Sequence, residues 1–261
     1  MNLGFIGTGT ISAAIVRGLG PSFGERGTIH LSPRSATVAA ALAAEWPHVR
    51  VAASNQAVLD ASDVVMLAVR PQVAREVIPP LRFRPDHHVI SLIATLSLET
   101  LGDLVALARS ITKAVPLPAV ALGRGATAIY PPDPIAASLF DRTGTTIQVE
   151  DPASFDALSA ATATMASWFG FAESIAAWLI DNGIPAGESR RYVGAIFDGL
   201  AATAATMPGH DFPALAADHA TPGGLNEQLL DHLTQEKLFA GVRQGLDAIL
   251  ARIEGRAAPE S

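Results

Sequence analysis

Short apolar runs alternate with helix-like patterns through the first half of the chain. Runs of this kind, without regular polar alternation, are typical of parallel strands that are buried on both faces. The predicted strands lie near residues 2–6, 28–32, 49–52, 64–69, 88–93, 111–115, 126–130 and 145–149. The predicted helices cover residues 10–19, 35–45, 72–79 and 97–107. This alternation favours an α/β fold, with a doubly wound sheet covered by helices on both faces.

The pattern changes after Asp151, because apolar positions then recur at helical spacing and no convincing strand remains. The predicted helices cover residues 153–169, 172–182, 187–206, 212–219 and 224–254. Asn182-Gly183 has the composition of a helix C-cap, and Pro208-Gly209 that of a break. The change predicts a sheet domain of residues 1–151 and an all-helical domain of residues 152–261.

The last predicted helix is apolar over more than one narrow stripe, which exceeds what a surface helix needs. Its apolar positions are Leu229, Leu230, Leu233, Leu238, Val242, Leu246, Ile249, Leu250 and Ile253. Two interpretations stay open, namely packing inside its own domain and burial against a second copy of the chain. We therefore expect a homodimer or a higher homo-oligomer.

Composition narrows the function classes. Hydrophobic residues make up 49% of the chain and charged residues 16%, which supplies ample apolar surface for a core. The net charge of −7 argues against nonspecific nucleic-acid binding and against an anionic membrane surface, because both need a basic face. The absence of cysteine excludes disulfides, thiolate nucleophiles and Cys-ligated zinc. Met1 leads into a strand without a basic segment or a long apolar run, so we expect a cytoplasmic enzyme.

A glycine turn follows the first predicted strand, in the segment Gly7-Thr8-Gly9-Thr10-Ile11-Ser12. In a Rossmann dinucleotide-binding unit, Gly7 would permit the tight turn and Gly9 would let the backbone approach a pyrophosphate. The free N–H groups of the next helix would then bind that pyrophosphate. The third small position is Ser12 rather than glycine, which still allows close helix packing. The segment predicts dinucleotide binding, and a purely structural turn is the alternative.

The segment Ser32-Pro33-Arg34-Ser35 follows the second predicted strand, where a carboxylate would normally hold the ribose 2′-hydroxyl of NAD. No carboxylate is present there to repel a phosphate. Arg34, with hydroxyl donors from Ser32 and Ser35, suits a 2′-phosphate, so NADP(H) is favoured over NAD(H). The alternative is a solvated arginine in a turn.

Several motifs, in order, resemble the pyrroline-5-carboxylate reductase family. The matching segments are Gly7-Thr8-Gly9, Ser32-Pro33-Arg34, Asn55 with Ser62-Asp63, Leu67-Ala68-Val69-Arg70-Pro71-Gln72, Ser91-Leu92-Ile93-Ala94, Val115-Pro116-Leu117-Pro118-Ala119, Gly123-Arg124-Gly125-Ala126-Thr127 and Thr221-Pro222-Gly223-Gly224. Arg70 replaces the lysine of the family's LAVKPQ motif. The last segment is similar to the family's SPGGTT signature before the final helix. The resemblance covers most of the chain.

The resemblance implies a division of roles among these residues. Ser32 and Arg34 would hold the 2′-phosphate, and Asn55 the adenosine ribose. The segment Ala68-Val69-Arg70-Pro71 would lie beside the central and nicotinamide parts of the coenzyme, and Ala94 would also contact it. Pro116 and the segment Gly223-Gly224-Leu225 would contact the substrate. The resemblance also implies that the helical domain dimerises and that substrate binds between domains at the dimer interface.

The departures from the family lie on the substrate side. The family's SGSGPAY stretch should fall around residues 162–168 and is essentially absent, and Leu117 stands where the family has Asn-Thr. Asn226 matches a family threonine that hydrogen-bonds the ring nitrogen, and an amide donates as well but with a different reach. Glu227 and the Asp218-His219 pair are further candidates for proton donation, with helix capping as the alternative role. Asn226 and Glu227 are the predicted catalytic residues.

These observations predict NADPH-dependent reduction of a small cyclic imino acid, pyrroline-5-carboxylate to proline or a close analogue. Two alternatives stay open, namely an NADP-dependent reductase of a different imine or ketone and a non-catalytic NADP(H)-binding dimer. No metal is predicted, because His87-His88 would point apart on a strand and lack a third ligand.

Overall fold

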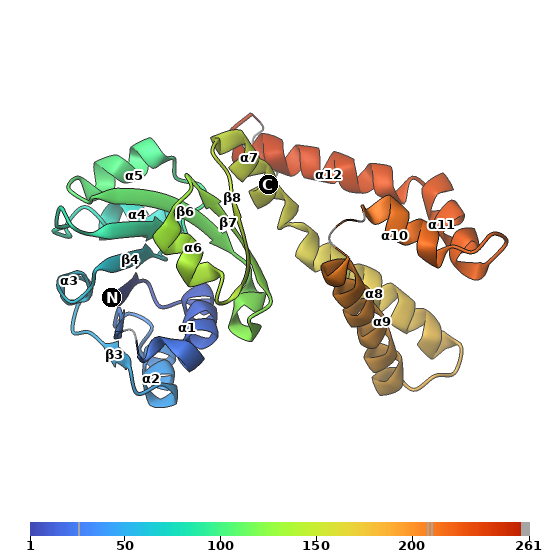
Figure 1. Ribbon diagram of the computed structural model, residues 1–261, viewed down its shortest axis with the longest axis horizontal. Coiled ribbons are helices and arrows are strands. Elements are labelled where there is room, and N and C mark those ends of the chain that lie inside the picture. Colours follow the sequence, from blue (N-terminus) through green and yellow to red (C-terminus); the bar gives the residue numbers. More distant parts are fainter. Residues whose placement is uncertain (26, 208, 210, 257–261) are drawn as a thin grey trace. The chain divides into compact units, whose positions relative to one another are not determined.

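The computed structural model describes residues 1–25, 27–207, 209 and 211–256. Contacts divide the chain into two compact units, Met1–Ser159 and Ala160–Ser261, which we call the sheet unit and the helical unit (Figure 1). The predicted break at Pro208 lies outside the described residues. The predicted domain boundary after Asp151 stays a prediction.

The sheet unit contains, in its described residues, an eight-stranded sheet of order β3-β2-β1-β4-β5-β6-β7-β8. The strands are β1 (Leu3–Ile6), β2 (Ile29–Leu31), β3 (Val49–Val51), β4 (Val64–Leu67), β5 (His88–Ser91), β6 (Ser110–Pro116), β7 (Gly125–Tyr130) and β8 (Gly144–Gln148). Strands β1 to β6 are all parallel, whereas β7 runs antiparallel to β6 and pairs in parallel with β8. The predicted strands are confirmed, with most of them shorter than expected.

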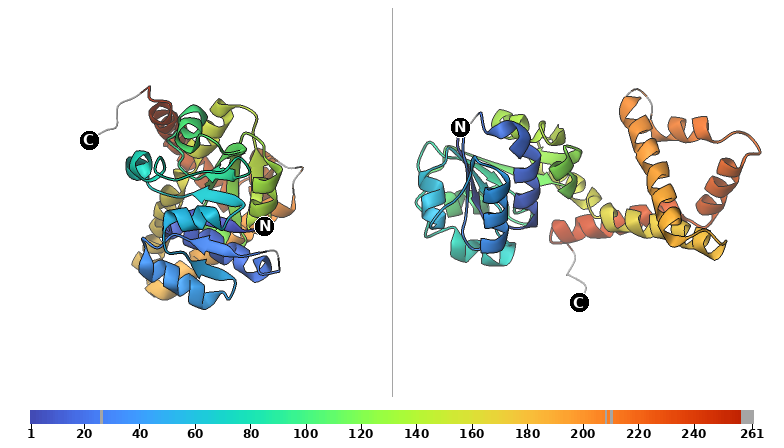
Figure 2. Two further views of the ribbon diagram at one scale, coloured as in Figure 1. Left: turned by 90° about the vertical axis from the view of Figure 1, so that its left-hand side faces the viewer. Right: turned by 90° about the horizontal axis from the view of Figure 1, so that it is seen from below.

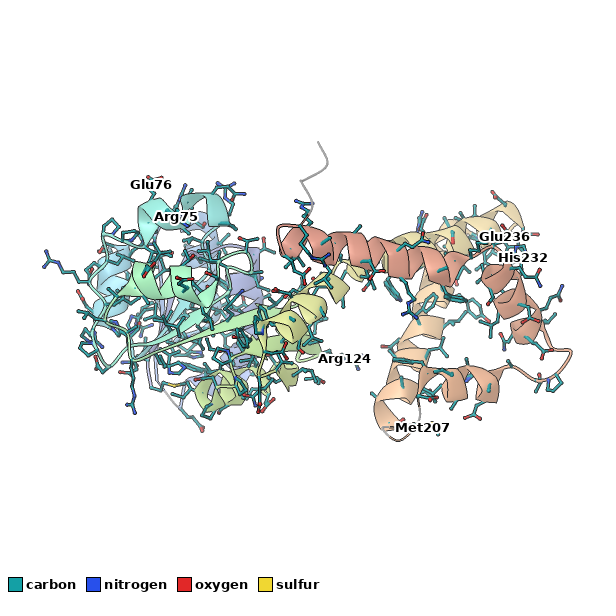
Figure 3. All side chains as sticks on the ribbon, turned by 90° about the horizontal axis from the view of Figure 1, so that it is seen from above. Arg75, Glu76, Arg124, Met207, His232 and Glu236 are labelled. Atoms are coloured by element: carbon teal, nitrogen blue, oxygen red, sulfur yellow. The ribbon has the colours of Figure 1, made fainter. Side chains whose placement is uncertain are left out.

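Helices cover both faces of this sheet (Figures 1 and 2). They are α1 (Thr10–Phe23), α2 (Ala36–Glu45), α3 (Asn55–Asp60), α4 (Pro71–Val77), α5 (Leu98–Val105), the 3₁₀ turn η1 (Pro118–Leu122) and α6 (Pro134–Phe140). Alternate strand residues point to opposite faces, so Phe5 packs with α1, α2 and α6, while its neighbour Ile6 packs with α3, α4 and α5. On α4 the charged side chains Arg75 and Glu76 are exposed and extend away from the sheet (Figure 3).

Local side chains define where several of these helices begin. The Ser54 and Ser97 hydroxyls accept the N–H groups of Ala57 and Thr100, both at 3.1 Å. These are N-cap bonds that satisfy otherwise free backbone donors. Proline occupies the first position of α4 and α6, where its missing N–H costs nothing. Helix α3 was not predicted, because its six residues are too few to show helical periodicity.

The described part of the helical unit contains no strand, as predicted. Its helices are the end of α7 (Pro152–Ala161), then α8 (Thr164–Asp181), α9 (Ala186–Thr206), α10 (Phe212–His219), α11 (Leu225–Gln235) and α12 (Leu238–Ile253). Gly183, with φ of +90°, ends α8 beside Asn182, which confirms the predicted C-cap. The single final helix predicted over residues 224–254 is wrong, because Lys237 adopts a left-handed φ of +60° and separates α11 from α12.

Candidate functional site

The carboxyl ends of six parallel strands meet at one edge of the sheet, and most of the predicted coenzyme residues follow those ends. Ile6 pairs with Leu67, Leu67 with Ser91, and Ser91 with Lys113, so the loops after β1, β4 and β5 lie side by side. These loops and strand ends carry Gly7, Thr8, Gly9, Ser32, Arg34, Asn55, Ala68, Val69, Arg70, Ala94 and Pro116. Helix α1 leaves β1 toward one face and α4 leaves β4 toward the other. This is the switch point at which open α/β sheets bind ligands.

The glycine turn has the geometry that a dinucleotide phosphate needs. Gly7 has φ of +103°, and a Cβ built there would lie 2.6 Å from the Ala68 carbonyl oxygen, so only glycine fits. A Cβ built at Gly9 meets no atom within 4 Å, so the space in front of this residue is open. Gly9 is also the N-cap of α1, whose first turn has no acidic residue and no side-chain cap. The free N–H groups and the positive end of the helix dipole therefore favour an anion here.

Three buried hydroxyl groups hold this turn in place. Ser32 Oγ accepts the Gly7 N–H at 2.9 Å, and Ser12 Oγ donates to the Gly7 carbonyl oxygen at 2.7 Å. Thr8 Oγ1 donates to the Ser32 carbonyl oxygen at 2.9 Å. Ser12 occupies the third position of the glycine motif, and its buried hydroxyl is satisfied by this bond to the Gly7 carbonyl oxygen. Ser32 is 1% exposed, and its contact with a 2′-phosphate stays a prediction.

Arg34 is exposed, two residues beyond Ser32. In the described part of the chain its guanidinium has no hydrogen bond or ion pair. Ser35 is the N-cap residue of α2, which has no acidic residue in its first turn. Among the described residues, Arg34 is therefore a positive charge without an ionic partner at the end of β2. Its contact with a 2′-phosphate stays a prediction.

The remaining predicted coenzyme residues begin helices or lie in exposed loops. Thr10 is the first residue of α1, followed by Ile11, and Asn55 is the first residue of α3. Arg70 is the exposed N-cap of α4, with Pro71 at the first helical position. Ala94 is exposed between β5 and α5. All of these positions leave backbone groups or side chains accessible at the carboxyl edge.

The predicted substrate turn lies in the helical unit and is tied together by the two predicted catalytic residues. Glu227 Oε2 accepts the N–H of Gly223, whose φ is +72°, at 2.7 Å. Asn226 Nδ2 donates to the His219 carbonyl oxygen at 3.0 Å, which connects α11 to the end of α10. Gly224 caps α11, and Leu225 is 84% exposed. These bonds give Asn226 and Glu227 a structural role, and their catalytic role stays a prediction.

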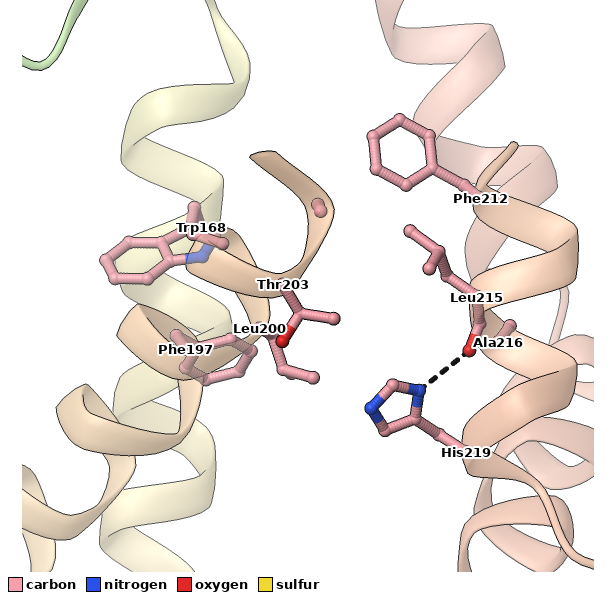
Figure 4. Close-up of a pocket in the computed structure, with 10 residues that line it drawn as sticks. Trp168, Phe197, Leu200, Thr203, Phe212, Leu215, Ala216 and His219 are labelled. Atoms are coloured by element: carbon pink, nitrogen blue, oxygen red, sulfur yellow. Dashed lines mark hydrogen bonds between the residues drawn. The ribbon is translucent and has the colours of Figure 1, made fainter. Parts of the chain in front are cut away.

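An apolar cavity of about 450 Å³ lies beside this turn, between α9 and α10 with Trp168 from α8 (Figure 4). The lining residues are Trp168, Phe197, Leu200, Ala201, Thr203, Ala204, Phe212, Leu215, Ala216 and His219. His219 Nδ1 donates to the Leu215 carbonyl oxygen at 2.8 Å, so in the neutral ring the other nitrogen is an acceptor. Thr203 uses its hydroxyl to donate to the Gly199 carbonyl oxygen. No lysine, arginine, aspartate or glutamate is among the described lining residues.

Lys113 is buried in β6 and packs on an aromatic ring. Its side chain is 7% exposed, and Nζ lies 4.8 Å from the centre of the Phe155 ring. Burial lowers the pKa of this lysine, and the negative charge of Asp156 opposes that change. The contact with Phe155 is a cation–π interaction.

A polar cluster at the opposite edge of the sheet was missed by the sequence analysis. His88 begins the strand predicted near residues 88–93 and is the first residue of β5. Its Nε2 lies 3.0 Å from Asp133 Oδ1, and its Nδ1 lies 2.5 Å from Ser110 Oγ. Asp133 Oδ1 also accepts the Ala136 N–H as the N-cap of α6, and these bonds join β5, β6 and α6. No local pattern predicts the cluster, because His88 and Asp133 are 45 residues apart.

The described residues contain no group of three or more histidine, aspartate or glutamate side chains placed to hold a metal ion. In the same part of the chain, no helix is both long and apolar enough to cross a membrane.

Comparison with known proteins gives consistent matches in both halves of the chain. Residues 2–95 match the family described as NADP oxidoreductase coenzyme F420-dependent, and residues 152–255 match the pyrroline-5-carboxylate reductase dimerisation family. A pyrroline-5-carboxylate reductase of Vibrio alginolyticus is 25% identical over 262 residues, which cover 97% of this chain and 96% of that protein.

Solved structures are similar over nearly the whole chain. A pyrroline-5-carboxylate reductase of Coxiella burnetii has a TM-score of 0.86 at 22% identity, covering 98% of each chain. The pyrroline carboxylate reductase of Plasmodium falciparum, solved with NADP bound, has a TM-score of 0.80 at 17% identity and covers 99% of this chain and 98% of that one. These likenesses confirm the predicted fold class, with a mostly parallel α/β sheet followed by a helical region from residue 152.

Proposed function

Because this chain belongs to the pyrroline-5-carboxylate reductase family of NAD(P)-dependent reductases, we propose that it reduces a small cyclic imino acid with NADPH. The favoured reaction is pyrroline-5-carboxylate to proline. The observation that carries the proposal is the open glycine turn at the β1–β4 switch point, where Gly9 and the N-terminus of α1 leave room for a pyrophosphate. Arg34, exposed and without a partner among the described residues, favours the phosphorylated coenzyme.

The chain's own residues would bind and orient the reactants. The coenzyme, when bound, supplies the hydride, so the protein needs to provide position and one proton. Residues 68–71 and Ala94 line the carboxyl edge beside the glycine turn, and Pro116 ends β6 at that same edge. We assign the contact with the imine nitrogen to Asn226 and the proton to Glu227. The second N–H of Asn226 Nδ2 and the second carboxylate oxygen of Glu227 are not used by the bonds that hold the turn.

A homodimer is part of this proposal. The helical unit buries few side chains by itself, and its described buried residues are Ala160, Ala176, Ser189 and Val193. Trp168, Phe169 and Trp178 on α8 are 43%, 66% and 62% exposed. A stable protein rarely exposes so many large apolar side chains, so a second copy of the chain is the partner that would cover them.

A second candidate function is reduction of a more apolar imine or of a ketone. The apolar cavity beside the substrate turn favours this candidate, because its described lining offers no lysine or arginine to a substrate carboxylate. Leu117 likewise presents an apolar side chain where the family has Asn-Thr. A larger apolar substituent would fill such a cavity, whereas a small imino acid would leave much of it empty.

The experiment that tests the proposal is oxidation of NADPH, followed by its absorbance, with pyrroline-5-carboxylate as the first substrate. A panel of cyclic imines without a carboxylate and of 2-keto acids follows under the same conditions. Turnover of pyrroline-5-carboxylate supports the favoured reaction, and turnover confined to the apolar imines or ketones supports the second candidate. Tight NADPH binding with no turnover of any compound would contradict both and leave a coenzyme-binding dimer.

A further inference from the structure

The glycine turn and the end of β2 are joined through one buried pair of hydroxyl groups. Ser32 Oγ accepts the Gly7 N–H, Thr8 Oγ1 donates to the Ser32 carbonyl oxygen, and the two hydroxyl oxygens lie 3.1 Å apart. Ser32 and Thr8 are each 1% exposed. The backbone of Gly7 is therefore held at its N–H by Ser32 and at its carbonyl oxygen by Ser12.

Counting donors shows that Ser32 has no proton to offer a ligand. A serine hydroxyl has one O–H donor, and so has a threonine hydroxyl. The Thr8 proton is directed to the Ser32 carbonyl oxygen, so across the 3.1 Å contact Ser32 is the donor and Thr8 the acceptor. Every donor in the pair is then used inside the protein. A direct bond from Ser32 to a phosphate would redirect this proton and break the buried hydrogen bond between the two hydroxyl groups.

We propose that Ser32 and Thr8 are positioning residues for the coenzyme. They hold the glycine turn, which faces the pyrophosphate, against the strand end that carries Arg34, which faces the 2′-phosphate. This inference rests on the proposed binding of NADP(H), and it gives Ser32 a different role from a direct phosphate contact. Its consequence is specific. The pyrophosphate is common to NADPH and NADH, so loosening the turn weakens the binding of both coenzymes. Loss of Arg34 weakens the binding of NADPH alone.

The test measures dissociation constants by calorimetry for NADPH and for NADH, with NADH titrated to millimolar concentration. Ser32→Ala should weaken both coenzymes by a similar factor of about ten, the order expected for one buried hydrogen bond. Arg34→Ala should weaken NADPH by about tenfold or more and leave NADH unchanged. Weakening of NADPH alone in Ser32→Ala would overturn the proposal in favour of a direct phosphate contact.

A matched pair at Thr8 guards against a variant that merely misfolds. Thr8→Ser keeps the hydroxyl and should bind both coenzymes like the wild type, whereas Thr8→Val keeps the shape and should weaken both. Equal binding by the two variants would overturn the proposal.

Amide hydrogen exchange of the coenzyme-free protein provides a readout that does not depend on binding. Peptides covering residues 7–12 should exchange faster in Ser32→Ala and Thr8→Val than in the wild type, while peptides from β5 stay unchanged. An unchanged exchange rate at residues 7–12 would contradict a positioning role of Ser32 and Thr8. A wild-type protein that binds neither coenzyme would instead defeat the proposed function, and the exchange result would still decide whether the hydroxyl pair holds the turn.

Discussion

His87 shows how a single buried ring makes stability depend on pH. Its Nδ1 accepts the Arg84 N–H at 3.0 Å, and its Nε2 donates to the Leu59 carbonyl oxygen at 3.1 Å, so one neutral tautomer satisfies both contacts. Burial lowers the pKa of this ring below 6.5, and the positive charge of Arg84 lowers it further. A proton on Nδ1 would abolish the bond from Arg84.

The sign of the effect follows from the lowered pKa. Below pH 6.5 the unfolded chain takes up a proton before the folded chain does, so folding stability falls as the pH drops. We expect the melting temperature of the wild type to decrease between pH 7.5 and pH 5 more steeply than that of His87→Gln, which cannot titrate there. Differential scanning calorimetry of both proteins measures this, and parallel curves would show that His87 does not contribute.

At the level of elements, the turn between α10 and α11 gives Glu227 two separable roles. Its carboxylate accepts the Gly223 N–H at 2.7 Å, which a glutamine amide oxygen would also accept. Glu227→Gln should therefore keep the stability of the wild type. Glu227→Ala should lower the free energy of unfolding by about 1 kcal/mol, because the helix-cap contact is lost. If Glu227 supplies the proton, as proposed, kcat of the glutamine variant falls by about 100-fold or more. A glutamine variant with wild-type kcat would limit Glu227 to capping.

Asn226 in the same turn has a different expected signature. Asn226→Ala removes the donor proposed for the imine nitrogen and also the bond to the His219 carbonyl oxygen. We expect kcat to fall by about tenfold or more while the dissociation constant for NADPH stays unchanged, because the predicted coenzyme contacts all lie in the sheet unit. Turnover measured at saturating NADPH, with calorimetric titration of the coenzyme, checks both parts. Unaltered turnover would remove Asn226 from the chemistry.

For the whole molecule, the exposed apolar side chains of α8 and α12 favour the proposed homodimer. A groove of about 640 Å³ runs between these helices, with Trp168, Phe171, Phe239 and Val242 in its lining. Val242 is 46% exposed. A charge placed in this groove would be buried without a partner in a dimer, at a cost of several kcal/mol.

Val242→Glu should therefore shift the protein from dimer to monomer in sedimentation velocity and lower its melting temperature. Gln244→Glu is the matched control, because it adds the same charge to an exposed position of α12 outside the described groove lining. It should sediment like the wild type. A wild-type protein that is monomeric at micromolar concentration, or a Val242→Glu variant that remains dimeric, would contradict the proposed assembly.

Local physics explains which features the sequence by itself determined. Buried parallel strands need unbroken apolar runs, and a turn at φ of +103° needs glycine, so β1 and the turn at Gly7 could be predicted from neighbouring residues alone. The helical second half was equally evident from its apolar spacing. The break at Lys237 could not be predicted, because a lysine in the left-handed conformation has no local sequence signature.

Only the tertiary structure decided the roles of several polar side chains. Ser32 lies two residues before Arg34 in sequence and resembles a phosphate ligand, but the pairing of β1 with β2 brings its hydroxyl to Gly7 and Thr8. The cluster of His88 with Ser110 and Asp133 likewise depends on strand order. The physical reason is that backbone preferences act over a few residues, whereas the partner of a buried hydroxyl or imidazole is chosen by which distant strands the packed sheet brings together.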